Sequence, residues 1–453
     1  MDILTIIRKQ AETWPNRLAF SQHGGVERVT YRQLIERIDS VARWLIERGC
    51  RGGERCGLML ADEADFLESA LGILEAGLCL VPIATFLPEE EKDFVIKAAG
   101  VHWLLRENHR LLRLPFADSA DDRNDEEFRA CDPAYIRFTS GTTGHRKGIL
   151  LGHQTILNRL DAADAILQIN PDDRIWFALP MADHFIASIL LYLSRGATIL
   201  TASTSADRRL IAQAYRPTIM YGSPDFYQDL IRSDIEALDS VRLAISTTAP
   251  LPNQVAEDFA RRFSKNLNPA LGIIEVGLLT LNTRADKVGS VGLAMPAYAV
   301  TLVGKNGRPI GTDEIGELYI NGPGLLDAYL APWRPVRRLL KQYGYPTGDF
   351  ARIDKDGYIF LAGRGKNRLQ INGIQFFCEE VETILNTLPG IEESRVFFDS
   401  TSQLLAAEVV GSPGPAERLS ELLLLKIDPR KVPRRFHIVE NLPRTPSGKL
   451  RRI

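Results

Sequence analysis

Segments with the apolar pattern of helices alternate with strand-length apolar runs through the first 110 residues, and this alternation is what most limits the fold. A capping box predicts that a helix starts at Thr30, and apolar residues recur at helical spacing over 30–49. Residues 56–60 and 78–83 are apolar runs of strand length, and the leucines of 67–74 form a helical stripe between them. Helices that alternate with strands predict an α/β fold with a mainly parallel sheet.

Later segments divide the chain further. Residues 117–127 are polar and acidic, which predicts a solvated surface loop. Residues 286–330 are rich in glycine, proline and β-branched residues, a pattern typical of a compact, twisted β-subdomain. A boundary is expected near 363–366, so that residues 1–363 form a large α/β sandwich domain and residues 364–453 form a small α+β domain.

The balance of charge excludes some classes of function. Among 453 residues, 55 are Lys or Arg and 57 are Asp or Glu, so the formal charge is -2 and nothing favours nucleic acid or a membrane surface. The five cysteines are scattered without a CxxC pair, which predicts neither a disulfide framework nor a zinc site and favours a reducing compartment. The start is interrupted by charges, unlike a signal peptide, and no apolar run approaches the ~18 residues that span a bilayer. The sequence therefore predicts a cytoplasmic protein with no membrane span.

A run of small and hydroxylated residues follows a strand that is predicted at 134–139. Glycines let the backbone approach a ligand closely, and backbone N–H groups and hydroxyls can then converge on an anion. Lys147 adds a positive charge suited to a β- or γ-phosphate. We expect a phosphate-binding loop formed by Thr139, Ser140, Gly141, Thr142, Thr143, Gly144 and Lys147.

A Walker loop is the nearest alternative, because Gly141 and Lys147 have the separation of the motif GxxxxGK[ST]. Arg146 stands where that motif needs its second glycine, and Gly148 stands where it needs the hydroxyl that binds Mg²⁺. The Walker interpretation is therefore rejected. A glycine-rich turn without a ligand would explain the glycines but not the hydroxyls beside Lys147.

The segment TSGTTGHRKG resembles the phosphate-loop signature of the adenylate-forming superfamily, which includes acyl- and aryl-CoA synthetases, adenylation domains of peptide synthetases, and firefly luciferase. Four further segments resemble motifs of that family in the family's order, and together they extend over essentially the whole chain. They are STTAPLP (246–252), LGIIEVG (271–277), YPTGDFARIDKDGYIFLAGRGK (345–366) and LPRTPSGKLRRI (442–453). The resemblance implies that the small C-terminal domain is mobile relative to the large one.

The resemblance also implies where the nucleotide binds. Ala249, Pro250 and Gly272 are expected to lie along ATP. Asp349 is expected to accept both ribose hydroxyls, because a carboxylate has two acceptor oxygens. Arg364 is expected to donate to the ribose or to the phosphates.

The expected catalytic charges come from three residues. The resemblance implies that Glu275 binds Mg²⁺, which needs few protein carboxylates. Lys147 and Lys449 are expected to stabilise the negative charge that develops in the transition state. Lys366 takes the position of the hinge residue about which the small domain rotates, and Gln375 matches a glutamine on the side where the thiol arrives.

Some positions depart from the family pattern. Leu271 replaces an aromatic residue that would stack on adenine, and Ile274 replaces a hydroxyl near the α-phosphate. Gln370 and Asn372 replace lysines that many CoA ligases have. CoA and a carrier protein therefore both stay open as the source of the thiol.

The segment from Phe177 to Leu200 corresponds to the family's acyl-pocket helix. His184 resembles the gate residue of acyl- and aryl-CoA ligases, and Asp183 has the sequence offset of the amine-binding Asp in amino-acid adenylation domains. Two structural alternatives stay open, namely that Asp183 only caps the following helix and that His184 is an ordinary core histidine. The predicted acyl pocket consists of Asp183, His184, Tyr221 and Gly222.

The resemblance implies that ATP and Mg²⁺ take part in a two-step reaction. The carboxylate of the substrate attacks the α-phosphate of ATP to give an acyl-adenylate. A thiol of CoA or of a carrier-protein phosphopantetheine arm then takes the acyl group. The leading hypothesis is an acid–thiol ligase for an acyl or aryl acid. The alternatives are an amino-acid-adenylating enzyme that loads a carrier protein and a non-catalytic nucleotide-binding homologue.

Overall fold

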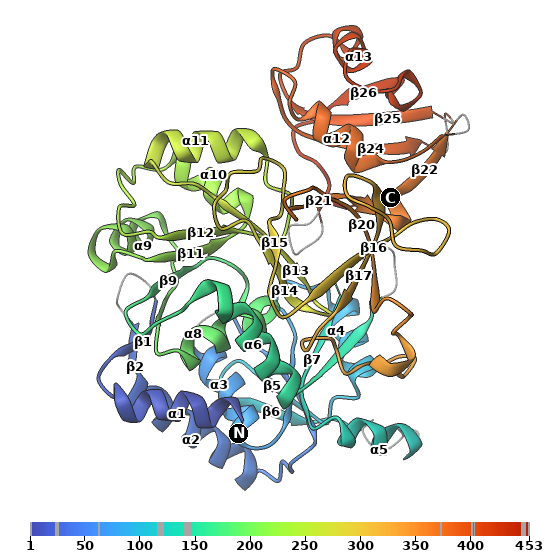
Figure 1. Ribbon diagram of the computed structural model, residues 1–453. Helices are drawn as coiled ribbons and strands as arrows, with labels where there is room; N and C mark the ends of the chain where they lie inside the picture. Colours follow the sequence, from blue (N-terminus) through green and yellow to red (C-terminus); the bar gives the residue numbers. More distant parts are fainter. Residues whose placement is uncertain are drawn as a thin grey trace.

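Two large sheets lie at the centre of the molecule in the computed structural model (Figure 1), which describes residues 2–22, 27–61, 64–115, 122–139, 146–371, 374–399, 402, 404–444 and 450–451. The first sheet has the strand order β15 (Leu293–Ala294), β14 (Gly277–Leu281), β13 (Asn268–Ile273), β12 (Leu243–Ser246), β11 (Ile219–Gly222), β9 (Arg174–Phe177), β10 (Thr198–Leu200), β1 (Leu18–Gln22) and β2 (Glu27–Thr30). The second sheet has the order β19 (Arg334–Pro335), β18 (Ala328–Tyr329), β8 (Gly148–Gly152), β7 (Pro133–Phe138), β4 (Cys79–Pro82), β3 (Arg55–Met59), β5 (Trp103–Arg106) and β6 (Arg110–Arg113).

Parallel pairing dominates the middle of each sheet, as the alternation of helices and strands predicts. In the first sheet the strands from β13 through β12, β11, β9 and β10 to β1 run parallel. In the second sheet β7, β4, β3 and β5 run parallel. In open α/β sheets, ligands bind outside the carboxyl ends of the parallel strands.

Helices fill the space between the two sheets and cover their outer faces. The helices of the large domain are α1 (Ile3–Thr13), α2 (Tyr31–Glu47), α3 (Ala64–Glu75), α4 (Glu89–Ala99), α5 (Asp122–Ala130), α6 (His153–Leu167), α7 (Met181–His184), η3 (Phe185–Ile189), α8 (Leu190–Ser194), α9 (Ser205–Leu210), η4 (Ile211–Tyr215), α10 (Pro224–Arg232), α11 (Asn253–Phe263) and η5 (Val336–Arg338). Buried residues of α1, α2, α3, α6 and α8 join both sheets in one core, whereas α10 and α11 pack on the other face of the first sheet.

The helix from Tyr31 confirms the predicted capping box. The Thr30 hydroxyl accepts a hydrogen bond from the Gln33 N–H group (3.3 Å), and the Gln33 side chain accepts one from the Thr30 N–H group (2.9 Å). Helix α3 differs from the single leucine stripe that the sequence predicts, since every residue from Ala64 to Leu74 except Asp65 is buried. This helix lies between two sheets and therefore has no face toward solvent.

The predicted acidic surface loop is partly wrong. Its second half belongs to α5, and residues 116–121 lie outside the described residues. Interactions with the rest of the fold stabilise this helix. Phe128 is buried, and the Glu127 carboxylate accepts hydrogen bonds from Trp333 and from Arg337 (2.7 Å). Polar composition alone did not indicate these distant partners.

The predicted β-subdomain extends further along the chain than the sequence pattern suggests. Its sheet has the order β16 (Ala299–Val303), β17 (Ile315–Asn321), β20 (Tyr345–Ile353) and β21 (Ile359–Arg364). A 3₁₀ turn, η6 (Gly365–Asn367), follows β21 directly, so the predicted boundary between 363 and 364 falls just before this turn.

The small domain follows and has its own core (Figure 1, orange to red). It contains the hairpin β22 (Arg368–Ile371) and β23 (Ile374–Phe377), helix α12 (Cys378–Leu385), a sheet of β24 (Ile391–Asp399), β25 (Leu404–Gly411) and β26 (Arg435–Ile438), helix α13 (Ala416–Leu424) and the 3₁₀ turn η7 (Pro429–Lys431). The α+β character of this part is as predicted.

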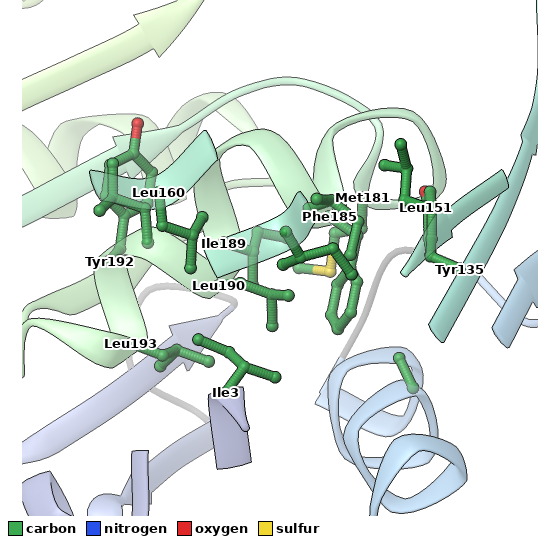
Figure 2. Close-up of a cluster of buried hydrophobic side chains, with 14 of the residues drawn as sticks. Ile3, Tyr135, Leu151, Leu160, Met181, Phe185, Ile189, Leu190, Tyr192 and Leu193 are labelled. Carbon is green, nitrogen blue, oxygen red and sulfur yellow. The ribbon is translucent and has the colours of Figure 1, made fainter. Parts of the chain in front are cut away.

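Figure 2 shows a cluster of buried hydrophobic side chains, in which Phe185 lies beside Met181 and near Tyr135. Phe185 is fully buried, so we expect Phe185→Ala to lower the free energy of unfolding of the large domain by about 3–5 kcal/mol. The midpoint of urea unfolding measures this loss. Phe86→Ala, which removes a ring that is 43% exposed, is the matched control and is expected to have a much smaller effect. Equal losses in the two variants would contradict the packing described here.

Candidate active site

The two ends of the predicted phosphate loop meet at the base of the β7–β8 hairpin. The Thr139 N–H group donates to the Lys147 carbonyl (3.0 Å), and the Lys147 N–H group donates to the Thr139 hydroxyl (3.1 Å). These two bonds fix where the loop begins and ends. The other predicted loop residues, Ser140, Gly141, Thr142, Thr143 and Gly144, lie outside the described residues.

Lys147, Tyr329 and Glu275 form a continuous chain of contacts beside the loop. The Lys147 ammonium lies 4.6 Å from the centre of the Tyr329 ring. The Tyr329 hydroxyl donates to Glu275 Oε1 (2.8 Å) and contacts the Tyr345 hydroxyl (2.7 Å). Burial raises the pKa of both tyrosines well above the usual value, so their hydroxyls stay protonated at neutral pH. The predicted phosphate-binding lysine and the predicted metal-binding carboxylate are therefore brought together.

Sequence reasoning missed Tyr329 and Tyr345. Tyr345 begins the segment that contains Asp349, and Tyr329 follows the glycine-containing turn at 322–324. The sequence signal that could have revealed these residues was a tyrosine close to a recognised motif. Its significance depends on a contact with Glu275, which is 54 residues away from Tyr329.

Arg159 is a second residue that the sequence did not reveal. It lies on the buried face of α6 and donates through Nε to the Gly324 carbonyl (2.7 Å) and through Nη1 to the Ile274 carbonyl (3.0 Å). Burial lowers its pKa to about 10, which leaves it positively charged at neutral pH. This buried cation fixes the backbone immediately before Glu275.

Residues assigned to the acid and to the nucleotide share one edge of the first sheet. Gly222, at the carboxyl end of β11, is paired with Ser246 at the end of β12, and the Thr247 N–H group donates to the Gly222 carbonyl (3.1 Å). Ala249 and Pro250 follow directly, half-buried and exposed respectively. This is the edge at which a parallel sheet binds ligands.

Gly272 lies on β13 with open space above its α-carbon. Among the residues that the structure describes, a Cβ atom there would meet only the Gly277 carbonyl oxygen, at 3.8 Å, so this part of the fold leaves room for a side chain. We expect Gly272→Ala to keep the unfolding midpoint unchanged and to weaken ATP binding about tenfold or more, because a methyl group would hold the nucleotide away from the backbone.

Gly52→Ala is the matched control, since a Cβ at Gly52 would also meet one backbone oxygen at 3.8 Å. Calorimetric titration with ATP measures both variants. ATP binding to Gly272→Ala as tight as to the parent would remove Gly272 from the nucleotide site.

Asp349 and Arg364 face each other across β20 and β21. Asp349 is buried, and Arg364 Nε donates to Asp349 Oδ1 (2.9 Å). Arg364, which the sequence assigned to the ribose or the phosphates, thus contacts the predicted ribose-binding carboxylate in this structure. The register of the two antiparallel strands places the opposite charges directly against each other.

The predicted acyl-pocket residues meet between the two sheets. The Asp183 carboxylate forms an ion pair with Arg137 of β7, with 3.1 Å between Nη2 and Oδ1. The His184 ring packs edge-on against Tyr221 with ring centres 5.8 Å apart, and Tyr221 stacks on Phe177.

The structure describes the surroundings of both residues for which the sequence left a structural alternative. Asp183 lies inside α7, whose N-cap is Pro180, and its carboxylate contacts Arg137 rather than a helix end. His184 is partly buried. Gly222 has a packing reason to be glycine, because a Cβ there would lie 2.3 Å from the Phe226 ring.

Both sides of the segment that carries Lys449 are tied to the small domain, although residues 445–449 lie outside the described residues. Arg444 pairs with Leu450, and the Arg451 N–H group donates to the Pro443 carbonyl (2.8 Å). Arg444 also donates to both carboxylate oxygens of Glu393 (2.8 and 2.7 Å), and buried Arg395 donates to the Arg451 carbonyl (2.9 Å).

The predicted hinge and thiol-side residues lie where the two domains meet. The backbone of Lys366 is in the middle of the η6 turn between β21 and β22. Gln375 contacts Gln370 across the β22–β23 hairpin (3.3 Å) and lines a groove. Residues of both domains form this groove, including Val303, Lys305, Phe350, Arg368 and Gln375.

Comparison with known protein families identifies the family to which these residues belong. Residues 7–330 match the family model of the AMP-binding enzymes, and residues 380–449 match the model of the AMP-binding enzyme C-terminal domain. The chain belongs to the AMP-binding enzyme family. The predicted membership of the adenylate-forming superfamily is confirmed.

Curated relatives of this AMP-binding enzyme include a CoA synthase, an acid–AMP ligase and a gramicidin synthase. Feruloyl-CoA synthase of an Amycolatopsis species is 26% identical over 476 residues, which are 97% of this chain and 96% of that protein. The p-hydroxybenzoic acid–AMP ligase FadD22 of Mycobacterium tuberculosis is 28% identical over 478 residues, 96% of this chain and 66% of that protein. Gramicidin S synthase 2 of Brevibacillus brevis is 27% identical over 492 residues, and the chain spans only 11% of its length.

Solved structures have the same fold. ATP-bound MatB from Rhodopseudomonas palustris superposes with a TM-score of 0.85 at 24% identity, covering 100% of this chain and 97% of that one. O-succinylbenzoate CoA synthetase (MenE) of Bacillus subtilis in complex with AMP has a TM-score of 0.85 at 20% identity, covering 99% and 97%. The family and its relatives support an AMP-forming acid–thiol ligase, which forms an acyl-adenylate and then transfers the acyl group to a thiol. Within the described residues, every helix falls short of the length or apolar content that crossing a membrane requires.

Proposed function

We propose that this AMP-binding enzyme activates an acyl or aryl carboxylic acid with ATP and Mg²⁺ and then loads it onto the thiol of CoA or of a carrier protein. The observation that carries this proposal is the contact chain from Lys147 through Tyr329 to Glu275. It brings a cation and a carboxylate together next to the fixed ends of the loop that the sequence assigns to phosphate.

Each polar residue of the site has a defined task in this proposal. Lys147 neutralises the phosphates, and Asp349 accepts the ribose hydroxyls. Glu275 would hold Mg²⁺, with its carboxylate oriented by the hydrogen bond from Tyr329, and one carboxylate suits a cation that keeps phosphate and water ligands. Mg²⁺, when bound, supplies positive charge that favours the departure of pyrophosphate. Such reactions depend mainly on positioning and electrostatics.

The small domain supplies the remaining groups. Lys449 donates to the transferring phosphate during adenylate formation, and rotation about Lys366 then withdraws it and brings Gln375 toward the incoming thiol. Arg444 donates to the Glu393 carboxylate and Arg395 donates to the Arg451 carbonyl, so the described residues on both sides of Lys449 are attached to the small domain, which supports this role. We place the domain boundary at the turn that contains Lys366.

The amino-acid alternative is weaker, because Asp183 is not free to bind an ammonium group. Its carboxylate is neutralised by Arg137 at 3.1 Å. An α-amino acid would have to displace that guanidinium, and breaking a partly buried ion pair is costly.

An exchange assay tests the proposal. ATP–pyrophosphate exchange over a panel of fatty, aryl and amino acids is expected to detect turnover with acyl or aryl acids in the presence of Mg²⁺. The non-catalytic alternative, which the replacements Leu271 and Ile274 suggest, predicts calorimetric binding of ATP without exchange on any acid. That second result would overturn the proposed function.

A further inference from the structure

The ion pair between Arg137 and Asp183 lies at the predicted acid-binding end of the site. Arg137 is on β7, two residues before Thr139, where the phosphate loop begins. On the same face of β7, the Tyr135 hydroxyl donates to the Ala182 carbonyl (3.2 Å), so this face of the strand packs on α7. The pair thus joins the strand that leads to the phosphates with the helix assigned to the acid.

The ion pair is mostly shielded from solvent. The side chains of Arg137 and Asp183 are each 25% exposed. Arg137 Nε is shielded from solvent and has no hydrogen-bond partner among the described residues, so Asp183 does not saturate the guanidinium. Two aromatic residues lie nearby: Tyr221 is close enough for the Arg137 charge to oppose the rise in its pKa that burial causes, and His184 packs against Tyr221. Burial lowers the pKa of the cation Arg159, which is also near enough for the Arg137 charge to lower that pKa further.

The charge of the pair restricts which substituent an acid could place against it. An ammonium group would be repelled by Arg137, and a second carboxylate would be repelled by Asp183. A hydroxyl carries no charge and can donate to the carboxylate while it accepts from the guanidinium. A hydroxyl of the substrate therefore forms hydrogen bonds with both charged side chains without breaking the ion pair. The flat rings of Tyr221 and His184 can also pack against the aromatic ring of an aryl acid.

We propose that Arg137 and Asp183 together form a specificity site for a hydroxyl group on an aryl carboxylic acid. This inference rests on the proposed function and names the substrate class of the same site. Arg137 determines the specificity by neutralising Asp183, which would otherwise select an amine.

Exchange assays with four benzoic acids test the site in the parent enzyme. The first is benzoic acid itself, and the rings of the other three carry a hydroxyl at position 3 or 4, a second carboxylate, and an aminomethyl group. We expect kcat/KM for a hydroxylated acid to exceed that for benzoate about 10- to 100-fold, because hydrogen bonds to charged groups are among the stronger ones. The two acids with an additional charge are expected to be poorer than the hydroxylated acid.

Two variants are expected to change the preference in opposite directions. Arg137→Leu leaves Asp183 unpaired, so the aminomethyl acid should gain at least tenfold relative to the hydroxylated acid. Asp183→Asn leaves Arg137 unpaired and keeps the shape of the side chain, so the dicarboxylic acid should gain instead. Since the two variants act independently, a folding defect in one leaves the other to decide.

Arg8→Leu is the matched control, because Arg8 lies outside the segment assigned to the acid. Arg8 also forms an ion pair with a carboxylate, that of Glu75, and the two side chains are 31% and 30% exposed, which is close to the values for Arg137 and Asp183. This control should keep the substrate order of the parent. A parent that does not prefer the hydroxylated acid, or variants that leave the order unchanged, would overturn the inference while exchange itself still supports the proposed function. Absence of exchange with every acid would instead overturn the proposed function.

Discussion

Lys449→Ala is expected to abolish adenylate formation while sparing the transfer of the acyl group from a preformed adenylate to a thiol. The physical reason is that, in the proposed mechanism, Lys449 donates to phosphate charge that develops only in the first step. Loss of one positioned donor costs roughly 10²–10³ in rate. The second step needs the small domain in another orientation, in which the lysine is withdrawn.

The test is helped by the contacts of the described residues on either side of Lys449, which attach this segment to the small domain. Arg444 pairs with Leu450 and with Glu393, and Arg395 holds the Arg451 carbonyl. Removal of the ammonium should therefore leave these ties intact.

Two assays separate the half-reactions of Lys449→Ala. ATP–pyrophosphate exchange measures the first, and thioester formation from a chemically prepared acyl-adenylate measures the second. Lys426→Ala, which changes an exposed lysine after α13 of the same domain, is the control and should retain both activities. Equal loss of both half-reactions in Lys449→Ala would refute the two-orientation mechanism.

Glu275→Gln is expected to raise the concentration of Mg²⁺ needed for half-maximal exchange about 100-fold. Changes to groups that only orient a metal ligand typically cost about 10- to 100-fold, and here the ligand's own charge is removed. The amide oxygen of glutamine can still accept the hydrogen bond from Tyr329, so the contact with β18 should survive.

Exchange rates measured against free Mg²⁺ check this expectation. Tyr329→Phe keeps the carboxylate but removes the hydroxyl that orients it, so a shift nearer to tenfold is expected. Glu236→Gln, at an exposed position of the large domain, is the control. An unchanged Mg²⁺ requirement in Glu275→Gln would mean that this carboxylate does not hold the metal.

Helix α2 and the turn between β20 and β21 illustrate what local sequence can predict. The capping box at Thr30 depends on atoms only three residues apart. The turn at Asp356 and Gly357, a dipeptide typical of hairpin turns, also depends on local contacts: Asp354 accepts from the backbone N–H groups of residues 356 and 358, and Gly357 has a positive φ of 86°. Such features depend on neighbours along the chain and hardly at all on the rest of the fold.

Helix α5 illustrates the opposite case. Its composition is polar, yet Trp333 and Arg337 bind Glu127 from more than 200 residues away. Composition predicts exposure to solvent, and it cannot indicate a partner that only the folded chain brings near.

The sequence alone determined the class of chemistry, because a hydroxyl-rich glycine loop and the four later motifs are local patterns whose residue types suit phosphate, ribose and a divalent cation. Only the tertiary structure decided how those residues are held: Tyr329 orients Glu275, Arg159 fixes the backbone before it, and Arg137 neutralises Asp183. The reason is that each of these contacts joins elements that pairing and packing of distant strands and helices bring together. Residue spacing along the chain carries no record of such pairing.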